Sequence, residues 1–237
     1  MKKNILFPLL LLTHLYSNNN VPFGIKSNCP TYITEDDYTM CYDDNIKNVS
    51  WISYTKEKRP NVNNLMFQFS LNNLINKSDE RIYRKYQTPI LTEKELKDSG
   101  YIVYSILPDY LQNKDSELLS LSILLYPNVY QNLKNIDKYE NELLLTKKIN
   151  IIRGIVPSKN IFIGKNMAIV PSSIYVIIYE FDKQNIQTFL LKNDNSISSR
   201  NIEDLKFDLK ELEKLTTNKF FIKNRAIRKI FKEELND

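Results

Sequence analysis

The sequence has little histidine and little glycine, and each shortage excludes a class of function. The only histidine among 237 residues is His14, which lies in an apolar N-terminal segment. Without an imidazole in residues 18–237, that part of the chain cannot form a Ser-His-Asp triad, a histidine general base or a His-containing zinc site. The four glycines, at positions 24, 100, 154 and 164, match neither G-x-G-x-x-G nor P-loop spacing. Dinucleotide-binding and P-loop functions are therefore excluded.

Cysteine is also scarce, since Cys29 and Cys41 are the only two. Two cysteines exclude a disulfide framework, and the sequence alone does not fix their distance in space. Two free thiols are the preferred interpretation. A single disulfide is the alternative, and it requires an oxidising compartment.

The composition is that of a folded chain with four segments. The hydrophobic fraction of 42% includes 11 Phe, 15 Tyr and 1 Trp, which is too apolar for a disordered protein. The net charge of +5 is too small to indicate nucleic-acid binding by itself. The predicted segments are an apolar leader at 1–17, an Asn-rich arm at 18–36, one domain at 37–222 and a basic tail at 223–237.

Apolar patterning predicts the secondary structure. Strands are expected at 38–43, 49–56, 65–71, 101–107, 149–153, 161–163, 168–180 and 186–192. A short helix at 92–98 begins at the capping residue Thr92, and a long helix ends near Lys148. A charged helix at 203–215 is expected to present Leu205, Leu209, Leu212 and Leu215 on one face. This order predicts an α+β fold, a mostly antiparallel sheet with a few helices packed on it.

Four blocks, in order, resemble the DNA/RNA non-specific endonucleases, and in particular the endonuclease G branch of the ββα-metal superfamily. They are CYDDNIKNVSWISY at 41–54, SGYIVYSILP at 99–108, PNVYQNLKNIDKYE at 127–140 and the run from INIIRGIVP to SSIYVIIYE at 149–180. The similarity spans Asp37 to Ile222, and Gly100, Gly154 and Gly164 fall on glycine positions of that family. The resemblance implies a ββα-metal endonuclease-like fold.

The second block is similar to the family's active-site signature, S-G-Y-D-R-G-H-L-A-P, in which the His is the general base. Ser105 stands at that position, and the preceding Asp, Arg and Gly are replaced by Ile102, Val103 and Tyr104. A serine hydroxyl cannot accept a proton from water near neutral pH, and Val103 cannot bind a phosphate as an arginine does. The resemblance therefore implies a degenerate signature and no catalytic residue.

The third block is similar to the family's metal-binding helix. Its magnesium ligand is an Asn, and a Glu eight positions later orients the metal's waters; Asn132 and Glu140 stand at this spacing. The alternative is a surface Asn and a solvated Glu. Because a lone Asn holds magnesium weakly, no metal and no other cofactor is expected.

Three functions follow from these observations. The preferred one is a pseudonuclease, not an enzyme, that acts as a structural or accessory subunit of a larger, mitochondrial assembly. The second is a non-cleaving nucleic-acid-binding module, which would use six cations of the C-terminal segment: Lys219, Lys223, Arg225, Arg228, Lys229 and Lys232. The third is an active metal-dependent endonuclease with Asp98 or Asp109 as its base.

The expected partners are protein subunits, with a homodimer and nucleic acid as alternatives and no small-molecule substrate. The resemblance implies a mitochondrial location. The leader favours the secretory pathway instead, since Lys2 and Lys3 precede an apolar run at 5–12 and no arginine occurs before Arg59.

Overall fold

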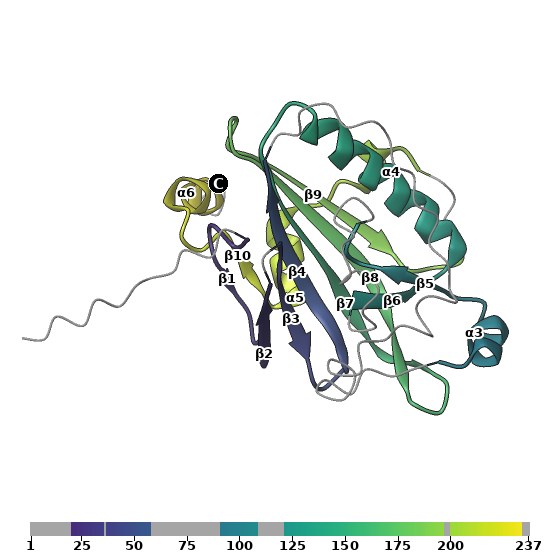
Figure 1. Cartoon of the computed structure of the whole chain (residues 1–237). Coiled ribbons are helices and arrows are strands. Elements are labelled where there is room, and N and C mark those ends of the chain that lie inside the picture. Colours follow the sequence, from purple (N-terminus) through teal and green to yellow (C-terminus); the bar gives the residue numbers. More distant parts are fainter. Residues whose placement is uncertain (1–19, 36, 58–90, 109–120, 197–199, 234–237) are drawn as a thin grey trace, which may run out of the picture.

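A six-stranded antiparallel sheet forms the centre of the computed structural model, which describes residues 20–35, 37–57, 91–108, 121–196 and 200–233. Its strand order is β2-β3-β4-β7-β8-β9, and each neighbouring pair is antiparallel (Figure 1). The strands are β2 (Thr31–Thr34), β3 (Thr39–Asp43), β4 (Asn48–Lys56), β7 (Ile149–Ile163), β8 (Ala168–Glu180) and β9 (Asn185–Lys192). The predicted α+β class with a mostly antiparallel sheet is confirmed.

Both faces of this sheet are covered. One face packs against helix α4 (Pro127–Leu144) and the hairpin of β5 (Ile102–Ser105) with β6 (Ser122–Leu125). The other packs against helix α5 (Leu209–Thr216), strand β10 (Lys219–Phe220), which pairs with β1 (Ile25–Lys26), and the start of helix α6 (Arg225–Glu233) (Figure 1). None of the helices in the described ranges is long and apolar enough to cross a bilayer.

The two covered faces explain the apolar character of the central strands. Side chains alternate between the faces of a strand. In β7, Ile151 therefore packs in the core beneath α4, whereas Ile152 packs in the core beneath α5. The expected strands at 149–153 and 161–163 are parts of this one long strand.

The single helix predicted at 203–215 is wrong. The chain instead forms a 3-10 helix, η4 (Ile202–Leu205), and then α5, whose first turn is capped by the Asp208 side chain. Between them the chain passes the edge strand β9, where Phe207 N–H donates to Thr188 O at 2.8 Å. Leu205 therefore packs beneath α4, and Leu209 and Leu212 pack on the opposite face, while Leu215 is exposed. The strand predicted at 65–71 lies outside the described residues.

The short helix predicted at 92–98 is confirmed as α3 (Glu93–Ser99). Thr92 and Glu95 form a reciprocal capping box at its start. Gly100 ends it with a φ of 73°, in the left-handed region that glycine adopts without strain.

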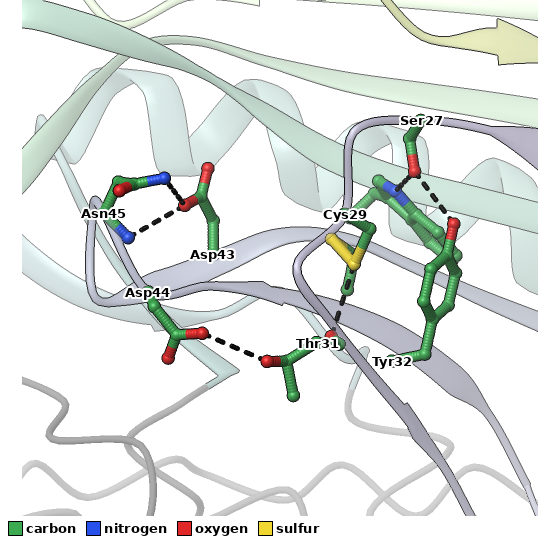
Figure 2. Close-up of a disulfide and its surroundings, with 9 residues drawn as sticks. Ser27, Cys29, Thr31, Tyr32, Asp43, Asp44 and Asn45 are labelled. Carbon is green, nitrogen blue, oxygen red and sulfur yellow. Dashed lines mark hydrogen bonds between the residues drawn. A yellow bond between two sulfur atoms is a disulfide. The ribbon is translucent and has the colours of Figure 1, made fainter.

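Cys29 and Cys41 form a disulfide, with Cα atoms 5.7 Å apart, so the free-thiol interpretation is wrong. The pairing of β2 with β3 brings them together, because Tyr32 lies opposite Cys41. Figure 2 shows Tyr32 and Ser27 beside Cys29, with their hydroxyl oxygens 3.1 Å apart. The arm predicted at 18–36 thus contributes β1 and β2 to the folded body.

Removing the disulfide should destabilise the protein through its unfolded state. The bridge joins residues separated by 12 positions, and closing a loop of this size contributes about 3 kcal/mol. The Cys29→Ser/Cys41→Ser double variant should lower the free energy of unfolding by about 3 kcal/mol in urea denaturation. Reductant should have the same effect on the wild-type protein and none on the variant. Equal denaturation midpoints for the oxidised wild type and the variant would contradict this expectation.

Candidate functional site

The segment that resembles the nuclease signature begins at the end of α3 and forms β5. Each residue of β5 has a partner in β6, with Val103 opposite Leu124 and Ser105 opposite Ser122. Because side chains alternate, Val103 and Ser105 share one face of this hairpin, and Ile102 and Tyr104 share the other. The substituted positions 102–105 are thus divided between two environments.

On the face of β5 that carries Val103 and Ser105, Val103 packs against apolar side chains and Ser105 is buried. Val103 contacts a cluster that includes Leu96, Leu124 and Val170. Ser105 is 5% exposed, and its Oγ has no hydrogen-bond partner within the described ranges. A buried serine hydroxyl has neither the basicity nor the access to water that a general base requires.

The opposite face of β5 contributes Tyr104 to a buried charged cluster beneath α4. Arg153 of β7 donates from Nη1 to the Tyr104 hydroxyl at 3.0 Å. Its Nη2 lies 2.6 Å from Asp137 Oδ1 and 2.7 Å from Glu140 Oε2. Tyr54 of β4 donates to the same Glu140 oxygen at 3.4 Å. We call Tyr54, Tyr104, Asp137, Glu140 and Arg153 the arginine cluster.

Burial makes the charges of the arginine cluster strongly interdependent. Arg153 is 1% exposed and Glu140 is 0% exposed. Burial acts to lower the pKa of Arg153, but Glu140, Tyr54, Asp137 and Tyr104 together raise it well above its usual value. Burial, and then the charge of Asp137, raise the pKa of Tyr104 well above 10. The guanidinium therefore stays charged and the phenol stays neutral.

Asn132 and Glu140, the candidate metal residues, are both buried on α4, so the alternative of a surface Asn and a solvated Glu is wrong. Asn132 Oδ1 accepts a hydrogen bond from the backbone N–H of Arg200 at 2.9 Å. It thereby anchors the chain between β9 and η4, whereas Glu140 contacts Arg153.

These contacts do not fit a magnesium ion at the candidate residues. Magnesium needs hard oxygen ligands at about 2 Å in octahedral geometry and retains several waters. The Glu140 oxygen lies 2.7 Å from the Arg153 guanidinium, whose positive charge repels a second cation. In the described part of the chain, no group of three or more His, Cys, Asp or Glu side chains is arranged to hold a metal.

The positive charge of the basic C-terminal segment is partly compensated by a carboxylate of the same chain. Glu213 of α5 is 4% exposed, and it binds Arg228 through two hydrogen bonds, at 2.7 and 3.1 Å. Lys219 lies 3.4 Å from the same carboxylate. Two of the six candidate nucleic-acid-binding cations therefore hold α6 and β10 against α5. Lys223, Arg225 and Lys229 are exposed.

Three candidate residues of the sequence analysis remain, namely Asp98, Asp109 and Lys232. Asp98 lies exposed on α3. Asp109 lies outside the described residues, as does the side chain of Lys232.

Sequence reasoning missed Arg153, Asp137 and Glu213. A signal for Arg153 was present, because it interrupts the apolar run INIIRGIV at 149–156. A charged residue in a buried strand requires a charged partner.

Comparison with known proteins identifies the fold. No family model matches the sequence, and no curated protein matches it. A chain in the crystal structure of the EndoG/EndoGI complex, described as showing the mechanism of EndoG inhibition, is similar with a TM-score of 0.65. The identity is 16%, and the match covers 87% of this chain and 91% of that one. The chain therefore has an endonuclease G-like α+β fold of the ββα-metal type, as the resemblance implied.

Tyr104→Phe should change the dependence of stability on alkaline pH. The folded pKa of Tyr104 lies well above 10.0, while the unfolded tyrosine ionises near that value. Its contribution to stability is therefore fully present below pH 10 and is lost as the pH rises toward the folded pKa. The variant should lose about 1–3 kcal/mol of unfolding free energy at neutral pH, because Arg153 loses a buried partner.

Above pH 10, the stability of Tyr104→Phe should fall less steeply than that of the wild type. Urea denaturation across the alkaline range measures this slope, with the exposed Tyr32→Phe as the matched control. Identical alkaline slopes for the wild type and Tyr104→Phe would show that Tyr104 does not carry this effect.

Proposed function

We propose that this chain is a catalytically inactive endonuclease G-like protein that serves as a structural or accessory subunit of a larger assembly. The observation that carries the proposal is the packing of the signature segment. Val103, at the position of the phosphate-binding Arg, packs against an apolar cluster; Ser105, at the position of the general base, is buried; and Tyr104 binds Arg153. These positions contribute to folding in place of catalysis.

The arginine cluster supports the absence of activity in a second way. Glu140, which the resemblance relates to orienting a metal's waters, contacts Arg153 at 2.7 Å. A carboxylate held by a buried guanidinium is a weak ligand for a second cation. Neither the base nor the metal of a nuclease mechanism then has a suitable side chain among the aligned residues.

Because the signature has lost its catalytic groups, we propose that the fold is retained for a role in an assembly. The similar solved structure is a complex, in which EndoG is inhibited. By analogy, we propose protein subunits as the partners of this chain; this reasoning rests on the fold and not on a mapped surface. The nucleic-acid alternative is weakened because Lys219 and Arg228 are both paired with Glu213, which compensates part of their positive charge.

The cellular location is a separate proposal. The resemblance favours mitochondria, whereas the Cys29–Cys41 disulfide and the leader at 1–17 favour an oxidising compartment reached through the secretory pathway. We favour the secretory location, because the disulfide is a property of the folded chain itself.

A cleavage assay tests the proposed inactivity. The purified full chain, with Mg²⁺ or Mn²⁺, should leave supercoiled plasmid and single-stranded RNA intact, because no base or phosphate-binding arginine remains in the signature. Asp98→Asn and Asp109→Asn are the matched variants. Cleavage that co-elutes with the wild-type chain would contradict the proposal, and its loss in either variant would identify the base.

The same preparation distinguishes the proposed role as a subunit from the alternative role as a nucleic-acid-binding module. We expect the native protein, isolated under mild conditions, to migrate with a large complex that nuclease treatment does not dissolve. Salt-dependent binding to DNA or RNA that is lost in Lys223→Ala/Arg225→Ala would favour the binding module instead. The control is Lys183→Ala/Lys210→Ala, which removes one lysine from the turn between β8 and β9 and one from α5.

A further inference from the structure

The β7–β8 hairpin extends beyond the neighbouring strands of the central sheet (Figure 1). Pairing with β4 reaches only as far along β7 as Gly154, and pairing with β9 begins on β8 at Ser173. The pairing of β7 with β8 continues without these neighbours to Ile163 and Ala168. Residues 157–167, which we call the hairpin tip, therefore project past both flanking strands.

Three large apolar side chains of the hairpin tip are exposed. Ile161 is 48% exposed, Phe162 is 44% exposed and Met167 is 58% exposed. Exposed apolar side chains that gather in one place indicate an interaction surface, whereas single ones need no explanation. Met167 also has a φ of 56°, in the left-handed region that is unfavourable for a residue with a side chain. Backbone strain of this kind is retained where the conformation serves a function.

The hairpin tip is held in place by α3. The backbone N–H of Lys165 donates to Glu95 Oε1 at 2.9 Å. A Cβ atom at Gly164 would lie 2.7 Å from Leu91 Cδ2, so the backbone of the turn approaches this side chain closely. Ile163 packs against an apolar cluster to which α3 and β6 contribute. A surface that is fixed in this way before binding loses little conformational entropy when a partner binds.

The charge of the hairpin tip is positive. Lys159 and Lys165 are exposed, and the sequence from 157 to 167 contains no Asp or Glu. The nearby Glu95 carboxylate accepts hydrogen bonds from the backbone N–H groups of Thr92 and Lys165. A partner that covers the apolar side chains should therefore present carboxylates to the two lysines.

We infer that the hairpin tip is the surface through which this chain docks onto a protein subunit, in an apolar groove with acidic residues at its rim. The inference deepens the proposed function and rests on it, because it needs the assembly in which the chain is proposed to serve. Side chains alternate along β7, so Ile161 and Phe162 lie on opposite faces of the strand. A groove encloses both side chains, whereas a flat surface covers only one. Phe162 is the central anchor, since buried aromatic side chains contribute most to an interface.

Two other occupants fit the hairpin tip less well. In a symmetric dimer the same patch meets itself, so a second copy of this chain would bring Lys159 and Lys165 of both copies together without an acidic residue in either tip. In a membrane, Lys165 and Asn166 at the end of the turn would enter the bilayer first, together with the polar backbone of the turn.

The test follows the tagged full chain through native isolation from its own cells under mild conditions. Phe162→Ser/Met167→Ser should weaken docking by about 30-fold or more, so the fraction that migrates with the large complex should fall. Leu145→Ser/Leu215→Ser removes two side chains of similar exposure elsewhere and should migrate as the wild type does. Lys159→Gln/Lys165→Gln should weaken docking by about fivefold, and Lys159→Arg/Lys165→Arg should not.

Thermal stability shows whether the hairpin tip is covered within the chain itself. The Tm of purified Phe162→Ser/Met167→Ser should lie within about 2 °C of the wild-type value, because both side chains are exposed. A larger fall would show that these side chains pack against another part of the same chain, and it would overturn the inference.

Failure of this inference is distinguishable from failure of the proposed function. If the wild type does not migrate with a large complex, both fail. If the wild type and Phe162→Ser/Met167→Ser migrate with it equally, only the inference fails. It also fails if the purified wild type forms a dimer, or binds phosphatidylserine-containing vesicles, and the same variant does not, since the occupant is then a second copy or a membrane.

Discussion

The buried charge of Arg153 is the constraint on which the rest of the structure beneath α4 depends. A guanidinium that is 1% exposed must be surrounded by acceptors, because its desolvation would otherwise cost several kcal/mol. The fold supplies them from β5 and α4, through Tyr104, Asp137 and Glu140, and Tyr54 of β4 donates to the same Glu140 oxygen. One residue of β7 thereby contacts both β5 and α4, and it holds α4 on the sheet.

The same constraint connects the architecture to the proposed loss of activity. A nuclease centre needs groups that remain available to water, metal and phosphate. Here Glu140 forms a buried ion pair with Arg153, Tyr104 accepts a hydrogen bond from the same residue, and Val103 packs against apolar side chains. The polar side chains of this region therefore stabilise the fold. On the far face of the sheet, Glu213 has a similar function, since it binds Arg228 and Lys219 and secures the C-terminal segment.

Local patterns in the sequence predicted most of the fold, and features that depend on tertiary contacts were missed. Strands β3, β4, β8 and β9 and helix α3 were predictable because their periodicity and caps are local. The break between η4 and α5 was not, because the helical spacing of Leu205 and Leu209 continues across it while the two residues pack on opposite faces of the sheet. The local pattern also predicted that Ser105 lies in a strand and Glu140 on the long helix. It did not predict the partner of Glu140 or the disulfide, because both depend on distances between separate segments.

The central claim is that Arg153 and Glu140 stabilise the protein as a pair in which each compensates the buried charge of the other. A double-mutant cycle of Arg153→Met, Glu140→Gln and the double variant measures this coupling most directly, through the free energies of unfolding in urea at pH 7. The account predicts that Arg153→Met costs about 3–5 kcal/mol and that the double variant costs clearly less than the sum of the two single variants. Additive costs, within about 0.5 kcal/mol, would show that the two charges do not depend on each other and would contradict the account.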